Sequence, residues 1–253
     1  MKETNTKSKH IVRFSGGKES TAMLLRMIEL DMQIDDITFC DNGLEYPEIY
    51  EYIKKVEKYI DRKITVIKPK KTWDELFYTK VKKGRFKGRI RGFPYVVLPG
   101  CWASRDLKVR PMEKLNNKTD LYYLGINFNE KKRVQYEKGH CENLRYPLID
   151  WKWTEHHCLK YLRDKKLENP VYKKFKRTGC WLCPKQSIIA LRILYNDYPD
   201  LWKKLRHYEI DSPHGFSPNK DLYQLECRFK NESKSLENSE FYQKSLIELG
   251  VKA

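Results

Sequence analysis

Short apolar runs alternate with amphipathic stretches over the first 150 residues. The runs at residues 11–14, 37–40, 64–67 and 121–126 are rich in apolar and β-branched side chains and predict strands. Between them, residues 21–30 and 46–60 place apolar side chains at helical spacing. Strands that alternate with helices predict βαβ units, and therefore an α/β fold with a mainly parallel, doubly wound sheet.

The pattern changes to helices after residue 150. Helical periodicity predicts helices at residues 154–165, 187–198 and 239–249, while the polar stretch 228–238 predicts a linker or tail. We therefore expect two parts, an α/β domain over residues 1–150 and a helical region over residues 151–253.

Composition narrows the class of protein. The 253 residues are 40% hydrophobic and 13% aromatic, which argues against general disorder. No apolar run approaches the roughly 18 residues of a membrane span, and the N-terminus lacks the apolar segment of a secretory signal. We expect a soluble, cytoplasmic protein without a membrane partner. Its seven cysteines then favour metal ligation or redox chemistry over a disulfide framework.

Ser15-Gly16-Gly17-Lys18-Glu19-Ser20 lies between a predicted strand and a predicted helix. Two glycines allow a tight turn that points backbone N–H groups at an anion, and the helix N-terminus adds positive potential. The serine hydroxyls can donate hydrogen bonds, and Lys18 supplies a charge. This loop resembles the phosphate loop of the N-type ATP pyrophosphatases and sulfonucleotide reductases, and so predicts a nucleotide site in the first domain.

Several further motifs follow the glycine loop along the chain. Asp41-Asn42-Gly43 precedes Tyr46-Pro47-Glu48, and further segments end at Arg177-Thr178-Gly179-Cys180. Over roughly residues 10–205, the chain resembles the phosphoadenosine phosphosulfate reductase family of the adenine nucleotide alpha-hydrolase-like superfamily. Asn42 stands where that family has Thr, and Asn127 and Lys132 interrupt a later motif.

The resemblance implies roles for individual residues. It implies that Lys18, Ser20, Arg105 and Lys108 act in catalysis. The nucleotide-binding residues that it implies are Ser15, Gly16, Gly17, Lys18, Glu19, Ser20, Asp41, Asn42, Gly43, Gly125, Glu130 and Arg133.

Cys180-Trp181-Leu182-Cys183, in the second region, has the spacing of a metal-binding pair. Cys101 lies in the segment that supplies cluster cysteines in iron–sulfur members of the family. The fourth ligand is Cys227 or Cys141, which the sequence leaves open. We predict an iron–sulfur cluster of the 4Fe-4S type, with a zinc site or no metal as alternatives.

Two enzymatic functions fit these features. In the first, an ATP pyrophosphatase uses ATP and Mg²⁺ to adenylate a substrate, which a sulfur nucleophile then attacks; a cysteine desulfurase would be the sulfur donor. In the second, the protein is a sulfonucleotide reductase, but Glu226-Cys227 matches that family's catalytic tail poorly. A third alternative is a non-catalytic nucleotide-binding accessory subunit.

Charge bears on the choice between them. The chain carries 51 Lys and Arg against 34 Asp and Glu, a net charge of +17. The segment 80–91 holds seven of these cations and no acid, and predicts a mobile, solvated loop. With Trp73, Phe86, Phe93 and Tyr95 available for stacking, this surplus favours a nucleic-acid substrate, DNA in a phosphorothioation system or tRNA in thiolation. A general bias toward lysine is the alternative.

Overall fold

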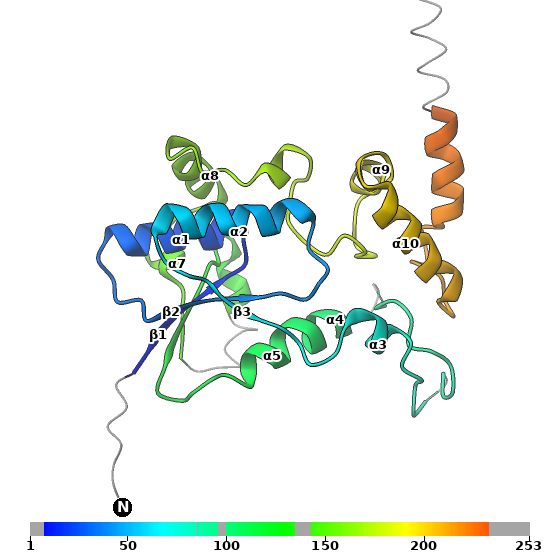
Figure 1. Cartoon of the computed structure of the whole chain (residues 1–253), viewed down its shortest axis with the longest axis horizontal. Coiled ribbons are helices and arrows are strands. Elements are labelled where there is room, and N and C mark those ends of the chain that lie inside the picture. The colour runs from blue at the N-terminus through cyan, green and yellow to red at the C-terminus, as the bar shows by residue number, and fades with distance from the viewer. Residues whose placement is uncertain (1–7, 85, 96–99, 135–142, 233–253) are drawn as a thin grey trace, which may run out of the picture. The chain divides into compact units, whose positions relative to one another are not determined.

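A parallel sheet forms the centre of the fold in the computed structural model, which describes residues 8–84, 86–95, 100–134 and 143–232 (Figure 1). Within these residues the sheet has five strands in the order β3-β2-β1-β4-β5. The strands are β1 (His10–Phe14), β2 (Asp36–Cys40), β3 (Thr65–Ile67), β4 (Leu121–Leu124) and β5 (Leu144–Arg145). All four pairings are parallel, which confirms the predicted α/β class.

β1 lies in the middle of the sheet because both of its edges are paired. Val12 lies opposite Ile37 of β2 and Tyr123 of β4. Val12 and Phe14 are buried, as expected for a strand covered on both faces. The chain leaves β1 toward β2 and β3 on one side and later returns to β4 on the other. The strand order therefore reverses between β1 and β4.

Helices cover both faces of the sheet. Figure 1 shows α1 (Lys18–Glu29) and α2 (Pro47–Ile60) on one side, close to the predicted ranges. On the other side, α4 (Trp102–Ser104), η1 (Arg105–Val109) and α5 (Arg110–Glu113) follow one another without a break. The η1 segment is a π-helix, a form that is rare and concentrates at functional sites.

Shorter elements complete this part of the fold. α8 (Glu155–Asp164) packs against α1 and begins at Thr154, whose side chain accepts the His157 N–H. The remaining elements are η2 (Phe128–Arg133), α7 (Pro147–Asp150) and η3 (Pro170–Lys173).

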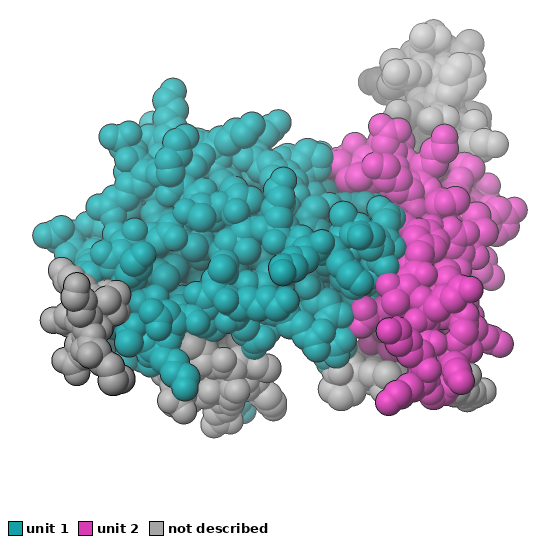
Figure 2. Space-filling model, turned by 60° about the horizontal axis from the view of Figure 1, so that its bottom comes forward, with its two compact units in different colours: residues 1–76, 100–181 teal, residues 77–99, 182–253 magenta. Residues whose placement is uncertain are grey.

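The chain divides into two compact units (Figure 2). Unit 1 contains residues 1–76 and 100–181, and unit 2 contains residues 77–99 and 182–253. The boundary predicted at residue 150 falls inside unit 1. Residues 77–99 belong to unit 2 because of aromatic packing. The ring centroids of Phe77 and Tyr208 lie 5.0 Å apart, and those of Phe93 and Phe216 lie 5.2 Å apart.

The helices of unit 2 are α9 (Ile188–Asp197), α10 (Pro199–Asp211) and a further helix at residues 222–232. α3 (Trp73–Phe77) ends at Phe77, the first residue of unit 2. The prediction of a linker over residues 228–238 is wrong for 228–232. Phe229 is buried against Tyr195 and Trp202, and this apolar anchor holds the otherwise polar stretch in a helix. The helix predicted at 239–249 lies outside the described residues. None of the described helices has the length and apolar character needed to span a membrane.

Candidate nucleotide-binding site

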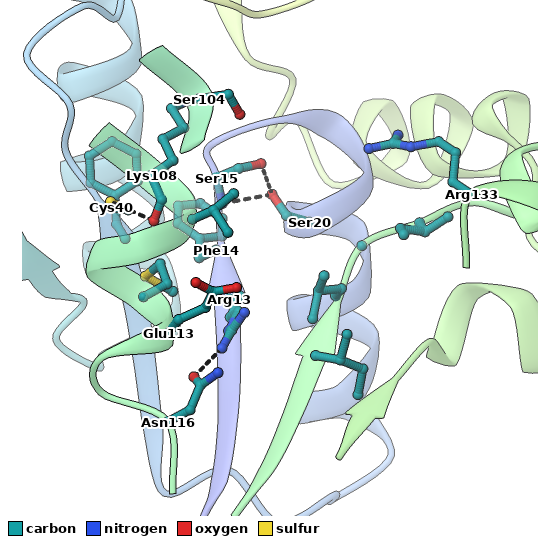
Figure 3. Close-up of a pocket in the computed structure, with 17 residues that line it drawn as sticks. Arg13, Phe14, Ser15, Ser20, Cys40, Ser104, Lys108, Glu113, Asn116 and Arg133 are labelled. Atoms are coloured by element: carbon teal, nitrogen blue, oxygen red, sulfur yellow. Dashed lines mark hydrogen bonds between the residues drawn. The ribbon is translucent and has the colours of Figure 1, made fainter. Parts of the chain in front are cut away.

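A cavity of about 340 Å³ opens in unit 1 at the carboxyl ends of β1, β2 and β4 (Figure 3). This is the point where the strand order reverses, the usual ligand position in open parallel sheets. Its polar and charged lining consists of Arg13, Ser15, Ser20, Cys40, Ser104, Lys108, Glu113, Asn116 and Arg133. Of the predicted residues, Ser15, Ser20, Lys108, Gly125 and Arg133 line this cavity.

The serines of the glycine loop hold one another in place. Ser15 and Ser20 Oγ atoms lie 2.9 Å apart, and Ser20 Oγ also accepts the Ser15 N–H and donates to the Gly17 carbonyl. Gly16 has φ +72°, a conformation that favours glycine and turns the chain into α1. The loop therefore places the side chains of Ser15 and Ser20 at the cavity, and hydroxyl groups of this kind can bind phosphate.

Lys18 occupies a different position from the one expected of a mobile phosphate-binding charge. It is buried, its Nζ lies 2.9 Å from Glu155 Oε1 of α8, and it packs over the Tyr172 ring. Burial alone would lower its pKa, but the hydrogen bond to Glu155 and the neighbouring Glu19 carboxylate raise it above the ordinary value. Lys18 therefore connects α1 to Glu155 of α8 and to Tyr172 of η3. It does not line the cavity.

Lys108, in the π-helical segment η1, lines the cavity. Its Nζ donates to Glu45 Oε1 at 2.6 Å, and the Glu45 side chain is only 4% exposed. Burial disfavours the Lys108 ammonium, yet the charge of Glu45 and the nearby Cys180 hold its pKa above the ordinary value. Lys108 therefore brings a permanent positive charge to the cavity.

The sequence reasoning missed five polar residues of the cavity lining, which are Arg13, Cys40, Ser104, Glu113 and Asn116. The Arg13 guanidinium donates to Asn116 Oδ1 and lies over the Tyr122 ring, as Figure 3 shows for the first pair. A signal was present, because an arginine between the buried Val12 and Phe14 of a central strand is unusual unless it faces a polar site.

The other predicted site residues lie away from the cavity lining. Asp41 accepts hydrogen bonds from Tyr50 Oη and the Gly43 N–H, and Glu130 pairs with Arg133 at 2.8 Å. Arg105 is exposed and paired with Asp106. Gly16, Gly17 and Glu19 form the back of the loop, and nucleotide contacts of all these residues stay predictions.

The predicted metal ligands are distributed over both units. Cys101 and Cys180 belong to unit 1, and Cys183 and Cys227 to unit 2. Asn42 Nδ2 lies 3.5 Å from Cys180 Sγ. Within the described residues, no three His, Cys, Asp or Glu side chains gather closely enough to hold a metal ion. The four cysteines therefore stay predicted ligands of a cluster or a zinc ion, and Cys141 lies outside the described residues.

Two other cysteines are held as neutral thiols. Burial raises the pKa of Cys40 to about 11 and that of Cys158 to about 12. Cys40 Sγ donates to the Leu107 carbonyl, and Cys158 is fully buried. Since the thiolate is the reactive form, both should be poor nucleophiles and poor ligands.

We therefore expect iodoacetamide, added to the native protein near neutral pH, to alkylate the exposed Cys227 well before Cys40 or Cys158. Peptide mass spectrometry over time gives the order, and alkylation in denaturant shows that each thiol can react. Equal native rates for Cys40 and Cys227 would contradict the assignment.

The fold and the cavity define a parallel α/β protein with a glycine-rich loop at the switch point of its sheet. The family model described as the phosphoadenosine phosphosulfate reductase domain matches residues 9–186. The chain belongs to this family, which confirms the resemblance seen in its motifs.

Two curated relatives from Methanocaldococcus jannaschii are themselves uncharacterized proteins. MJ0066 is 30% identical over 216 residues, which are 78% of this chain and 42% of that protein. MJ0973 is 28% identical over 246 residues, which are 90% of this chain and 55% of that protein. The chain thus spans about half the length of the curated relatives it matches.

Similar solved structures include a phosphoadenylyl-sulfate reductase from Candida auris, with a TM-score of 0.48 and 17% identity over 71% of this chain and 84% of that one. A U34-tRNA thiolase, NcsA from Methanococcus maripaludis, was solved with its 4Fe-4S cluster. It has a TM-score of 0.45 and 13% identity over 80% of this chain and 71% of that one.

Proposed function

We propose that the protein is an ATP pyrophosphatase that adenylates a nucleic acid, so that sulfur can replace an oxygen of this acceptor. The observation that carries this proposal is the cavity at the switch point. There the hydroxyls of Ser15 and Ser20 lie among the cations Arg13, Lys108 and Arg133. Such a set of donors and positive charges suits a nucleoside polyphosphate.

The proposed reaction begins when an acceptor oxygen attacks the α-phosphorus of ATP. The bond to the β-phosphate breaks, pyrophosphate leaves with Mg²⁺, and the acceptor oxygen becomes bonded to AMP. The terminal sulfur of a persulfide, supplied by a donor such as a cysteine desulfurase, then bonds to the activated atom and displaces AMP. A thiol reductant next cleaves the S–S bond to the donor, which leaves one sulfur on the acceptor and the donor cysteine as a thiol. The cavity's cations would neutralise the charge that moves onto pyrophosphate.

The position of Cys227 favours this reaction over sulfonucleotide reduction. Reduction needs a cysteine on a mobile tail, whereas Cys227 lies within the helix at residues 222–232. The neighbouring Glu226 binds Trp202 Nε1 and pairs with Arg206 and Lys230, so this part of the helix is tied to α10. Moving Cys227 away from α10, as a mobile tail would, requires these contacts to break.

A 4Fe-4S cluster or a zinc ion on Cys101, Cys180, Cys183 and Cys227 is a separate part of the proposal. No step above depends on it, because the described side chains do not form a metal-binding group. Metal analysis and the visible spectrum of anaerobically purified protein test this part directly, since a cluster absorbs visible light and zinc does not.

Replacing Ser20 with alanine tests the proposed site. Ser20→Ala removes a cavity hydroxyl that also holds the Ser15 N–H. We expect release of pyrophosphate from Mg²⁺-ATP, measured with nucleic acid present, to fall about 100-fold, as for the loss of one charge-stabilising donor.

Thr21→Ala is the matched control. Thr21 is buried beside Ser20 and donates to the same Gly17 carbonyl, but it does not line the cavity. It should keep most of the activity. Equal losses in both variants would contradict the assignment, and sulfite formation from adenylyl sulfate with a thiol reductant would favour the reductase alternative.

A further inference from the structure

The basic segment of unit 2, which its composition predicts to be a mobile, solvated loop, is mostly exposed and forms the backbone hydrogen bonds of a hairpin. Within residues 79–84 and 86–91, hereafter the basic hairpin, the Val81 N–H donates to the Arg89 carbonyl at 2.8 Å. The Gly88 N–H donates back to Val81, and the Arg91 N–H donates to Thr79. Lys80 and Ile90 form an antiparallel bridge. The backbone thus holds its cations in a defined arrangement.

The base of the hairpin is fixed to the core of unit 2. The Gly92 N–H donates to the Phe77 carbonyl, and the Phe77 and Phe93 rings lie 5.3 Å apart. A Cβ at Gly92 would lie 2.8 Å from Ser212 Oγ and 2.9 Å from His214 Cε1, so the chain passes directly against the turn after α10. Little ordering of the backbone would be needed on binding a ligand.

Five cations of the hairpin are available for a partner. Lys80, Lys82, Lys83, Lys87 and Arg89 are exposed, and none makes an ion pair within the described part of the chain. The hairpin contains no acidic residue. Such a cluster of like charges calls for an anionic ligand with several charges in a row.

An aromatic column accompanies these cations. Phe86, between the hairpin's two arms, is 37% exposed and stacks on Tyr95 with a centroid distance of 6.1 Å. Tyr95 in turn stacks on His214 at 4.3 Å, and the His214 Nε2 lies 3.0 Å from the Phe93 carbonyl oxygen. Trp73 and Phe93, which the sequence also offered for stacking, are buried. Phe86 is therefore the most exposed ring of this stack, and Tyr95 and His214 support it.

We propose that the basic hairpin binds single-stranded nucleic acid, with its five cations on successive phosphates and Phe86 stacked on an unpaired base. Phosphate contacts would serve a duplex equally well, but an exposed ring needs a base that is free of its own stack. This inference rests on the proposed function for its biological role, since it names the form of the acceptor.

The test is fluorescence anisotropy of the full chain with a labelled single strand of about 15 nucleotides and with the matching blunt duplex. The single strand should bind more tightly, and its affinity should fall steeply as salt rises. Lys82→Gln, Lys83→Gln and Lys87→Gln in one variant should weaken binding at least about 10-fold and reduce the salt slope by about 2.

A control variant carries Lys54→Gln, Lys58→Gln and Lys63→Gln, which remove the same charge from exposed positions of unit 1. It should keep most of the affinity. Phe86→Ala should weaken single-strand binding about 10-fold and leave duplex binding unchanged, while Phe86→Trp restores the single-strand preference. Circular dichroism verifies that each variant is folded.

Equal losses in the two triple variants would overturn the proposal, as would an unchanged single-strand affinity in folded Phe86→Ala. Binding to vesicles of anionic lipid without binding to the oligonucleotide would also overturn it. Pyrophosphate release from the same preparations separates the two proposals. Single-strand binding without pyrophosphate release would count against the ATP reaction alone, and the reverse result would count against the hairpin alone.

Discussion

Gly125→Ala is expected to destabilise unit 1 by about 3 kcal/mol and to abolish nucleotide binding. Gly125 follows β4 and lies against the first turn of α1. A Cβ at this position would be 2.6 Å from the Ser20 N atom and 2.7 Å from its Cα. Both are backbone atoms, so no side-chain rotation relieves the overlap, and the glycine loop has to shift. Urea unfolding and calorimetry with ATP measure the two effects.

Gly179→Ala is the control for this substitution. A Cβ at Gly179 meets no heavy atom within 4 Å, and its φ is not in the left-handed region. Its stability should stay within about 0.5 kcal/mol of the parent protein. If Gly125→Ala unfolds at the same urea concentration as the parent protein and binds ATP with the same affinity, the close approach of Gly125 to α1 does not shape the site.

Lys108→Met is expected to lower stability by about 2 kcal/mol and also to weaken nucleotide binding. The substitution leaves the Glu45 carboxylate buried without the ammonium that pairs with it at 2.6 Å. Loss of one partner from a fully buried pair costs roughly 3–5 kcal/mol, and the smaller figure reflects the 36% exposure of the Lys108 side chain. Urea unfolding measures the change in free energy.

A second variant separates the two effects of Lys108. Glu45→Gln combined with Lys108→Met removes the unpaired buried carboxylate of Glu45, so most of the lost stability should return. Nucleotide affinity should stay low, because the cavity still lacks the cation of Lys108. Recovery of both properties in the double variant would show that Lys108 acts on the fold and has no separate role at the nucleotide.

Local patterns were sufficient for the elements around β1. The apolar run at 11–14, the glycine loop and the helical periodicity after it each depend on neighbours within a few residues. The structure places β1 at His10–Phe14 and α1 at Lys18–Glu29 accordingly. The contacts of Lys18 were beyond such reasoning, since its partners Glu155 and Tyr172 follow more than 130 residues later. A lysine in a phosphate loop and a lysine in a buried ion pair look alike in the sequence.

The basic hairpin is a second feature that local sequence could not predict, because contacts with distant residues order it. Its lysines and glycines predict a solvated loop, because local composition contains no apolar contact that would order it. Order comes from its flanks, where Phe77 and Phe93 pack against Tyr208 and Phe216 more than 100 residues later in the chain. The same packing assigns residues 77–99 to unit 2 and moves the division away from residue 150.

The sequence by itself determined the α/β class, the family and the glycine loop, because strand and helix periodicity and a contiguous motif are written in consecutive residues. Only the tertiary structure decided which of the candidate residues face one cavity. Arg13, Lys108 and Arg133 come from three separate segments, and the pairing of β1 with β2 and β4 brings those segments to one edge of the sheet. Lys18 does not line this cavity and pairs with Glu155, while its catalytic role stays a prediction. Convergence of this kind depends on strand order and on long-range partners, and neither has a local signal in the chain.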